Sequence, residues 1–257
     1  MKIVEQIKFQ INNRKQFNNN SQKRNQMLLE YKCVLDKIKQ YEELYKDEVD
    51  NLKGHTHFAK KELTELVSNF MTENPEIVSY QDMIGKSIAM YCADIGLEEI
   101  VLQALDDETA AIQQDYLGYN LGMLAARNKL ETATIKALDN QVASIQQNES
   151  GENIGMVAAR NDLINATMKA VENKEAIHQV NMLGCTIGLT ALHHKMEEPV
   201  IKQLDMYPET LGQKSGYNVG YKTIAETFGL TNVIQKVYEV SRVNKSSCQD
   251  DTNENEL

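Results

Sequence analysis

The sequence predicts an all-α protein, an α-solenoid of about five stacked helix–turn–helix repeats with an N-terminal helical cap. Three observations lead to this fold class. A pattern recurs every 33 residues through the middle of the chain, the same residue types occupy equivalent places in each copy, and the 257 residues include only three prolines. Fixed periods of roughly 20–50 residues are typical of proteins whose repeats bury their apolar sides against one another.

The turn that opens each repeat carries the clearest part of the period. A glycine ends this turn every 33 residues, with a fifth copy after 32, and we expect a positive φ there. These glycines are Gly85, Gly118, Gly151, Gly184 and Gly216. Two residues later each copy has a favourable N-cap residue: Ser87, Asn120, Asn153, Thr186 and Asn218. The first helix of each repeat is therefore expected to begin just after the cap.

A small residue recurs inside each first helix, where glycine costs about 1 kcal/mol, so we expect neighbouring helices to approach closely there. The small residues are Ala89, Gly122, Gly155, Gly188 and Gly220. Each second helix repeats an apolar pair three residues apart, in the segments 102–105, 135–138, 168–171, 201–204 and 234–237. An extended linker to the next turn is expected from residues 112, 145 and 178 onward.

Composition divides the chain into four segments. They are a flexible basic N-terminal segment (1–25), an N-terminal helical hairpin or cap (26–73), the repeat domain (74–242) and a disordered acidic tail (243–257).

Within the hairpin, apolar residues at alternating steps of three and four form a heptad-like seam, which indicates a helix at 26–53. We expect a turn from Gly54 to His57 and a second helix at Phe58–Met71. A hairpin is favoured over a dimeric coiled coil, because the first repeat needs its apolar face covered. A monomer is thus favoured, and the coiled-coil dimer stays as the alternative.

At Gly118–Ala126 and Gly151–Ala159 the sequence resembles the ankyrin-repeat family. The turn glycine, the capping residue and the Ala-Ala pair match that family, in which Thr-Pro-Leu-His-x-Ala-Ala opens the first helix. The resemblance covers about 82–240. Ile, Leu or Val replaces the proline, Gly or Ala the leucine, and Met, Leu or Tyr the histidine, so these degenerate repeats are similar to those of microbial or bacterial proteins. The resemblance implies a binding surface formed by the repeat tips and a concave face.

Charge and cysteine content limit the classes of partner. The net charge is −10, and residues 1–61 hold 13 Lys/Arg against 8 Asp/Glu, so the repeats are strongly acidic. This argues against nucleic acid and favours a protein partner with a basic patch. The cysteines, scattered and without a CxxC pair, indicate reduced thiols and a cytoplasmic location. No apolar run approaches the ~20 residues that span a membrane, so no membrane partner is expected.

Motifs for catalysis are missing from the sequence: it has no P-loop, no dinucleotide glycine pattern and no metalloprotease helix. The pairs His55/His57 and His193/His194 lack the neighbouring ligands and the spacing of a metal site. We therefore expect no enzymatic activity, no cofactor and no bound metal.

The sequence predicts a non-enzymatic protein–protein interaction module that binds through the repeat tips and the concave face. Apolar residues in turns that face water, and charged residues on the first helices, are the candidates. The predicted partner-binding residues are Met83, Lys86, Tyr116, Leu117, Tyr119, Arg127, Glu149, Glu152, Arg160, Met182, His193 and Tyr217. Arg127 and Arg160 form a ladder that either pairs with a partner's carboxylates or joins adjacent repeats.

Two alternatives remain open. The chain is a self-associating structural or scaffold protein joined through the helix at 26–53, or it is a secreted bacterial effector that binds a host protein. The acidic tail motivates the second alternative, which would place the protein in the host cell cytosol.

Overall fold

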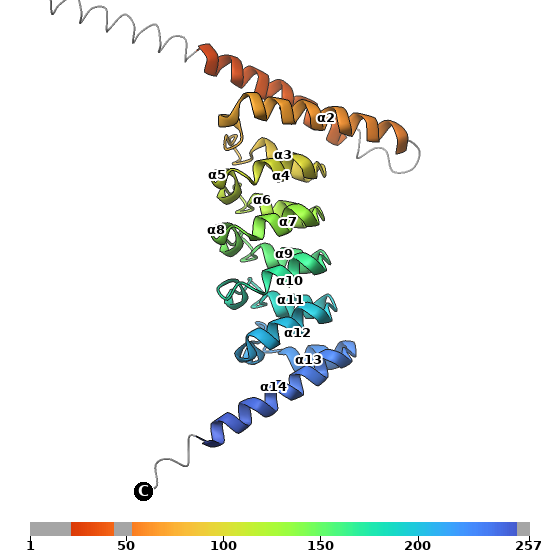
Figure 1. Cartoon of the computed structure of the whole chain (residues 1–257), viewed down its shortest axis with the longest axis vertical. Helices are drawn as coiled ribbons and strands as arrows, with labels where there is room; N and C mark the ends of the chain where they lie inside the picture. The colour runs from red at the N-terminus through yellow and green to blue at the C-terminus, as the bar shows by residue number, and fades with distance from the viewer. Residues whose placement is uncertain (1–21, 44–52, 251–257) are drawn as a thin grey trace, which may run out of the picture. The chain divides into compact units, whose positions relative to one another are not determined.

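The computed structural model describes residues 22–43 and 53–250 (Figure 1). This part of the chain is predominantly helical, and its only β-structure is isolated bridges within turns. The predicted all-α class is therefore confirmed. The chain divides into two compact units, residues 1–78 and residues 79–257.

The N-terminal unit contains a helix over residues 22–43, α2 (Lys53–Glu73) and the 3-10 turn η1 (Pro75–Ile77). The predicted turn from Gly54 to His57 is wrong, because these residues lie in the first turns of α2. A glycine near a helix start costs only about 1 kcal/mol and does not end the helix. The first helix is described from residue 22 on, so residues 22–25 of the segment predicted to be flexible are helical. Residues 1–21 and the seam positions after 43 lie outside the described residues.

The predicted seam of the first helix is buried in this unit. Tyr31, Leu35 and Ile38 are buried, and so are Leu63 and Val67 of α2. Both helices line the same surface pocket, so they lie side by side. The two helices therefore pack as a hairpin within one chain.

The C-terminal unit contains five consecutive repeats of the same helical pattern. In chain order their helices are α3 (Ile88–Asp94), α4 (Glu98–Ala104) and α5 (Glu108–Ile112); α6 (Leu121–Arg127), α7 (Glu131–Leu138) and α8 (Gln141–Ile145); α9 (Ile154–Arg160), α10 (Ile164–Ala170) and η2 (Ala176–His178); α11 (Ile187–His193), α12 (Glu197–Met206) and η3 (Pro208–Gly212); and α13 (Tyr221–Phe228) with α14 (Thr231–Asp250). We number these groups repeats 1 to 5.

Each repeat packs on the next through equivalent helices. The first helices contact one another in the order α3, α6, α9, α11, α13, and the second helices in the order α4, α7, α10, α12, α14. Figure 1 shows these pairs stacked in register, with α5, α8 and the two 3-10 turns gathered along one side. Every internal repeat therefore has a neighbour on both sides.

Side chains cap the first helices of repeats 1 to 4 as predicted. In each case a side-chain oxygen accepts a hydrogen bond from the backbone N–H three residues later, which satisfies one of the unpaired donors of the helix start. The capping residues are Ser87, Asn120, Asn153 and Thr186.

Glycine sets the distance between neighbouring first helices. A Cβ on Gly122 would lie 2.5 Å from Cδ1 of Ile154 and 2.6 Å from Cβ of Ala137. A Cβ on Gly155 would meet Cδ1 of Ile187 at 2.6 Å in the same way. The isoleucine that begins each next helix therefore sits over the glycine of the helix before it, and the predicted steric need is confirmed at these positions.

The fifth repeat corrects the predicted alignment. Asn218, expected to be an N-cap, has a φ of +60° and so takes the turn position of the earlier glycines, while Gly216 does not have a positive φ. The N-cap of α13 is Gly220, which was predicted as the small residue inside the helix. The offset from repeat 4 is therefore 34 residues, not 32. It follows the longer α12 and the turn at Pro208, and it also shifts the apolar pair predicted at 234–237 by one residue.

A third short helix follows each second helix in repeats 1 to 4, in a segment to which the sequence analysis assigned no element. The helix or 3-10 turn ends at Ile112, Ile145, His178 or Gly212. Asp107 and Asn140 cap the first two of these helices through their side chains. The predicted linker is extended from the glutamine that follows each helix, and only its first residue, at Ile112, Ile145 or His178, is still helical.

The last helix also overturns a prediction. α14 continues to Asp250, so the segment predicted as a disordered tail from residue 243 is helical over its first eight residues. Residues 251–257 lie outside the described residues.

Candidate functional site

The turns that open the repeats expose a row of apolar side chains. At the first tip position Met83 is 103% exposed, Tyr116 65% and Met182 78%. The neighbouring tip position carries Ile84, Leu117, Leu183 and Tyr217, all of them at least partly exposed. Large apolar side chains held in water at consecutive turns are the main candidate for a binding surface.

An aspartate or asparagine fixes the backbone of each turn in repeats 1 to 4. In repeat 2, Oδ1 of Asp115 accepts hydrogen bonds from the N–H groups of Leu117 at 3.0 Å and Tyr119 at 2.9 Å. The same pair of bonds is made by Asp82, Asn148 and Asn181. The tips are therefore held in one conformation before any partner binds.

Neighbouring turns are also bonded to each other. The backbone N–H of Tyr116 donates to the carbonyl of Ile84 at 3.1 Å, and the N–H of Glu149 to that of Leu117 at 3.0 Å. The approach is so close that a Cβ on Gly118, where φ is +77°, would lie 2.9 Å from Cα of Asn148. The row of tips is consequently one continuous hydrogen-bonded edge.

Glutamine side chains strengthen the same edge. Nε2 of Gln81 donates to the carbonyl of Gln114 at 3.0 Å, and Nε2 of Gln114 donates to that of Gln147 at 3.1 Å. Gln147 donates in turn to the carbonyl of Val180. Val180 ends this series and is 51% exposed beside the tip of repeat 4. It is a surface residue that our sequence analysis missed, although the break in the glutamine series would have revealed it.

Repeat 3 interrupts the apolar row with a polar tip. Glu149 and Ser150 are exposed, and Glu149 makes no ion pair with any residue that the structure describes. Glu152 was predicted to contact a partner, but it is buried and its carboxylate lies 2.8 Å from Nη1 of Arg160. This burial argues against a partner contact by Glu152, because Arg160, eight residues later at the end of α9, pairs with it.

The predicted arginine ladder lies on the first helices and is already paired. Nη2 of Arg127 lies 2.6 Å from Oδ1 of Asp94, one repeat earlier, and Lys86 reaches the other oxygen of Asp94 at 2.6 Å. The guanidinium of Arg127 also lies over the ring of Tyr119, which is half-buried. Arg127 therefore joins repeats 1 and 2, whereas the pairing of Arg160 stays within repeat 3. The two arginines could pair with a partner's carboxylates or with carboxylates of this chain, and in the structure they pair with carboxylates of this chain.

Histidines lie at the next place along the ladder, in repeat 4. The ring of His193 makes an edge contact with Phe228 at 6.3 Å, and Nδ1 of His194 lies 3.2 Å from Oδ1 of Asp162. Partial burial and, less strongly, the neighbouring His194 lower the pKa of His193. The lowered pKa favours the neutral imidazole of His193.

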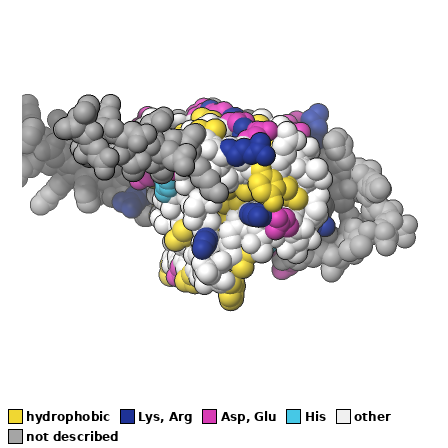
Figure 2. Space-filling view, turned by 90° about the horizontal axis from the view of Figure 1, so that it is seen from below, with side chains coloured by type: hydrophobic (Ala, Val, Ile, Leu, Met, Phe, Trp, Pro, Cys, Tyr) yellow, Lys and Arg dark blue, Asp and Glu magenta, His cyan; other side chains and the backbone are white. Residues whose placement is uncertain are grey.

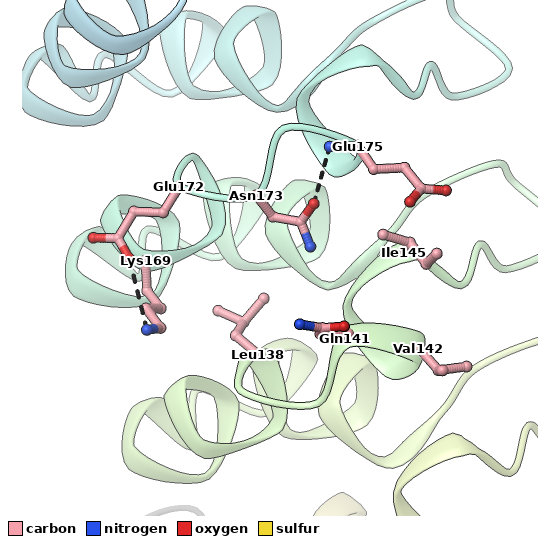
Figure 3. Close-up of a pocket in the computed structure, with 8 residues that line it drawn as sticks. All are labelled: Leu138, Gln141, Val142, Ile145, Lys169, Glu172, Asn173 and Glu175. Carbon is pink, nitrogen blue, oxygen red and sulfur yellow. Dashed lines mark hydrogen bonds and ion pairs between the residues drawn. The ribbon is translucent and has the colours of Figure 1, made fainter.

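A pocket of about 490 Å³ opens between repeats 2 and 3 (Figure 3). Leu138, Val142 and Ile145 lie on one side of it and Glu172 and Asn173 on the other. Its cation, Lys169, pairs with Asp139 at 3.3 Å and with Glu172 at 3.6 Å. These paired, solvent-open groups make no nucleophile–base pair, and none of the predicted binding residues lies here.

Other kinds of site find no support among the residues that the structure describes. No group of three or more His, Cys, Asp or Glu side chains is arranged to hold a metal ion. No helix in this part of the chain combines the length and the apolar content needed to cross a bilayer. Figure 2 shows that on the face formed by the end of the molecule near α14 the apolar side chains lie among Lys, Arg, Asp and Glu.

Comparison with known proteins adds no assignment to this geometry. No protein-family model matches the sequence, and no curated protein matches it significantly.

Proposed function

We propose that this chain is a non-enzymatic protein-binding module, an α-solenoid of five ankyrin-like repeats that binds its partner through the repeat tips and the adjoining first-helix face. The observation that carries the proposal is the row of exposed apolar tips on a bonded edge. Because the turns are fixed by side-chain and inter-repeat hydrogen bonds, little conformational entropy is lost when a partner binds.

The tips, rather than the arginine ladder, carry most of the binding in this proposal. Arg127 and Arg160 are engaged by Asp94 and Glu152, so their use by a partner would require breaking an existing ion pair. Met83, Tyr116 and Met182 have no such prior contact and can be covered at no cost in broken bonds. Apolar and aromatic anchors of this kind dominate binding energies at protein interfaces.

The test is affinity capture from the native cell with three versions of the full chain. The tip variant carries Met83→Ser, Tyr116→Ser and Met182→Ser. The control variant carries Val142→Ser and Ile164→Ser, which are also exposed but lie on α8 and α10. We expect the wild type and the control to capture the same partner and the tip variant to lose it while its circular dichroism is unchanged. Equal capture by all three would refute the proposal.

A further inference from the structure

We propose that the partner segment is an extended, polyproline II-type peptide with a basic side chain between apolar ones, in the pattern apolar-x-x-apolar-x-x-Lys/Arg-x-x-apolar. This inference rests on the proposed function and specifies the chemistry of its ligand. It follows from the chemical sequence of the tips and from their spacing.

The first tip position defines the chemical sequence. Along the stack it carries Met83, Tyr116, Glu149 and Met182, so one carboxylate lies between apolar groups on either side. The carboxylate of Glu149 makes no ion pair with a described residue, whereas that of Glu152 in the same turn is neutralised by Arg160. A partner therefore needs a cation opposite repeat 3 and apolar side chains opposite the others.

The hydrogen bonds define the spacing. Each turn has two paired arms, as between Asn148 and Glu152, where the backbone N–H to carbonyl distance is 3.0 Å. The next turn is bonded directly to the second tip position, as in the 2.9 Å bond that the backbone N–H of Met182 donates to the carbonyl of Ser150. Paired arms lie about 4.8 Å apart, so successive tips are separated by two such steps, or about 9.6 Å.

A polyproline II helix fits this spacing best. It has three residues per turn and rises about 3.1 Å per residue, so every third side chain points the same way at intervals of about 9.3 Å. A β-strand repeats its side-chain direction at about 6.6 or 13 Å, and an α-helix does so after seven residues, at about 10.5 Å. Over the three intervals from Met83 to Met182, the mismatch is about 1 Å for polyproline II and nearly 3 Å for an α-helix.

The side chains on the edge suit such a ligand. Tyr116 and Tyr217 are 65% and 79% exposed and offer aromatic faces, on which proline rings and apolar side chains pack. The net charge of −10 adds long-range attraction for a basic segment. A polyproline II peptide also loses little entropy on binding, because it is already extended in solution.

The probe is a phage-displayed library of random 12-residue peptides, selected on the full-length chain. We compare the wild type with Glu149→Lys, with the tip variant described above, and with the matched control Glu175→Lys, whose exposed carboxylate lines the pocket between repeats 2 and 3 and is not part of the tip row. We expect the wild type and Glu175→Lys to enrich the proposed pattern with prolines at intervening positions. Glu149→Lys should select Asp or Glu in place of the basic residue.

Fluorescence anisotropy with the synthetic consensus peptide then measures affinity. We expect Glu149→Lys to weaken binding at least tenfold at low salt and Glu175→Lys to leave it within twofold. Enriched apolar residues spaced by two or seven, or no exchange of charge preference in Glu149→Lys, would overturn the inference and leave the proposed function standing. No enrichment on the wild type beyond that on the tip variant would also overturn the inference, whereas the proposed function is refuted only by equal capture of the partner by all three versions in the experiment above.

Discussion

A single hydrogen atom at Gly122 determines how closely repeats 2 and 3 pack. Alanine is the better helix former by about 1 kcal/mol, yet its methyl group would overlap Ile154 and Ala137, at 2.5 and 2.6 Å. Cβ of Ala137 is attached directly to the backbone and cannot rotate away. The packing effect therefore exceeds the gain in helix propensity.

We predict that Gly122→Ala lowers the free energy of unfolding by about 1–2 kcal/mol, since overpacking in a well-packed core costs about 1–3 kcal/mol. Urea denaturation measures the change. Gly212→Ala is the control, because nothing lies within 4 Å of the added methyl group and the variant should stay within about 0.5 kcal/mol of the wild type. A more stable Gly122→Ala protein would contradict the role assigned to this contact.

Tyr221 replaces the isoleucine that covers the glycine in earlier repeats, and it introduces a buried hydroxyl. Its Oη lies near Gly188, and Nε2 of Gln203 donates to it at 2.9 Å. Burial raises the pKa of Tyr221 to about 12, although hydrogen bonds with Thr186, Gln203 and Thr210 act in the other direction. The folded protein consequently holds this proton at a pH where the unfolded chain releases it.

We predict that this tyrosine makes stability fall between pH 10 and pH 12. The folded pKa is raised above the unfolded value of 10, so the stabilising effect is complete below pH 10 and is lost as pH rises toward 12. At pH 8, Tyr221→Phe should be less stable than the wild type by about 1–2 kcal/mol, because Gln203 loses its partner. The gap should close or reverse by pH 11 in urea titrations. A gap that does not change with pH would contradict the prediction.

The second helices of repeats 1 to 4 have no capping side chain of their own, and α7, α10 and α14 each receive a hydrogen bond from a glutamate of the preceding repeat. α4, α7, α10 and α12 begin after Leu97, Leu130, Leu163 and Met196, which have no capping oxygen. In place of a local cap, Oε1 of Glu98 accepts from the N–H of Ala133 at 3.0 Å, one repeat later. Glu131 and Glu197 make the equivalent bonds. Helix termination is thereby linked to the stacking of repeats.

We predict that Glu98→Ala lowers the free energy of unfolding by about 1 kcal/mol, the usual effect of losing an N-cap. Glu99→Ala is the matched control, because Glu99 lies in the same first turn of α4 but is exposed and makes no bond to the next repeat. Thermal melting of both variants provides the comparison. Equal losses would mean that the effect comes from charge at the helix start and not from the bond to Ala133.

Local signals predicted a large part of the helical pattern from the sequence. The caps Ser87, Asn120 and Asn153 were identifiable because each satisfies a helix start next to it in the chain. The fifth repeat was not identifiable, because one residue beyond the 33-residue period places its turn at Asn218, and Gly216, two residues earlier, is a glycine close enough to be taken for the turn residue. The third short helices were missed since their five or fewer residues leave no periodicity to detect.

The candidate surface, like the helical pattern, could be predicted from the sequence only in part. Exposure of Met83, Tyr116 and Met182 agrees with their place in a predicted turn. Glu152 occupies an equally turn-like place but is buried, because its burial depends on Arg160, eight residues away. An ion pair between two side chains of one repeat does not change the 33-residue pattern, so the burial of Glu152 could be recognised only in the structure.

At the level of the whole C-terminal unit, stability depends on neighbours. Repeats 2 and 3 are packed on both sides, whereas repeat 5 contacts only repeat 4 through α13 and α14. In such stacks each repeat is stabilised by its own contacts and by the interfaces on either side. Opening should therefore begin at the less contacted end.

We predict that backbone amides of α6, α7, α9 and α10 exchange with deuterium at least tenfold more slowly than those of α13 and of α14. Hydrogen-exchange mass spectrometry at neutral pH resolves these segments. Uniform exchange across all five repeats would indicate that they open together. That result would contradict the expectation that each repeat is stabilised mainly by its interfaces with its immediate neighbours.

One position in α13 bears on how copies of the molecule can associate. In repeats 2 to 4 the second residue of the first helix is a glycine that receives the side chain of the next repeat, but in repeat 5 it is Lys222. The ammonium of Lys222 lies 5.1 Å from the centroid of the Tyr238 ring and 3.8 Å from Glu226, across the place where another repeat would seat. A head-to-tail arrangement that does not close on itself grows into filaments. This lysine therefore opposes polymerisation at the α13 end.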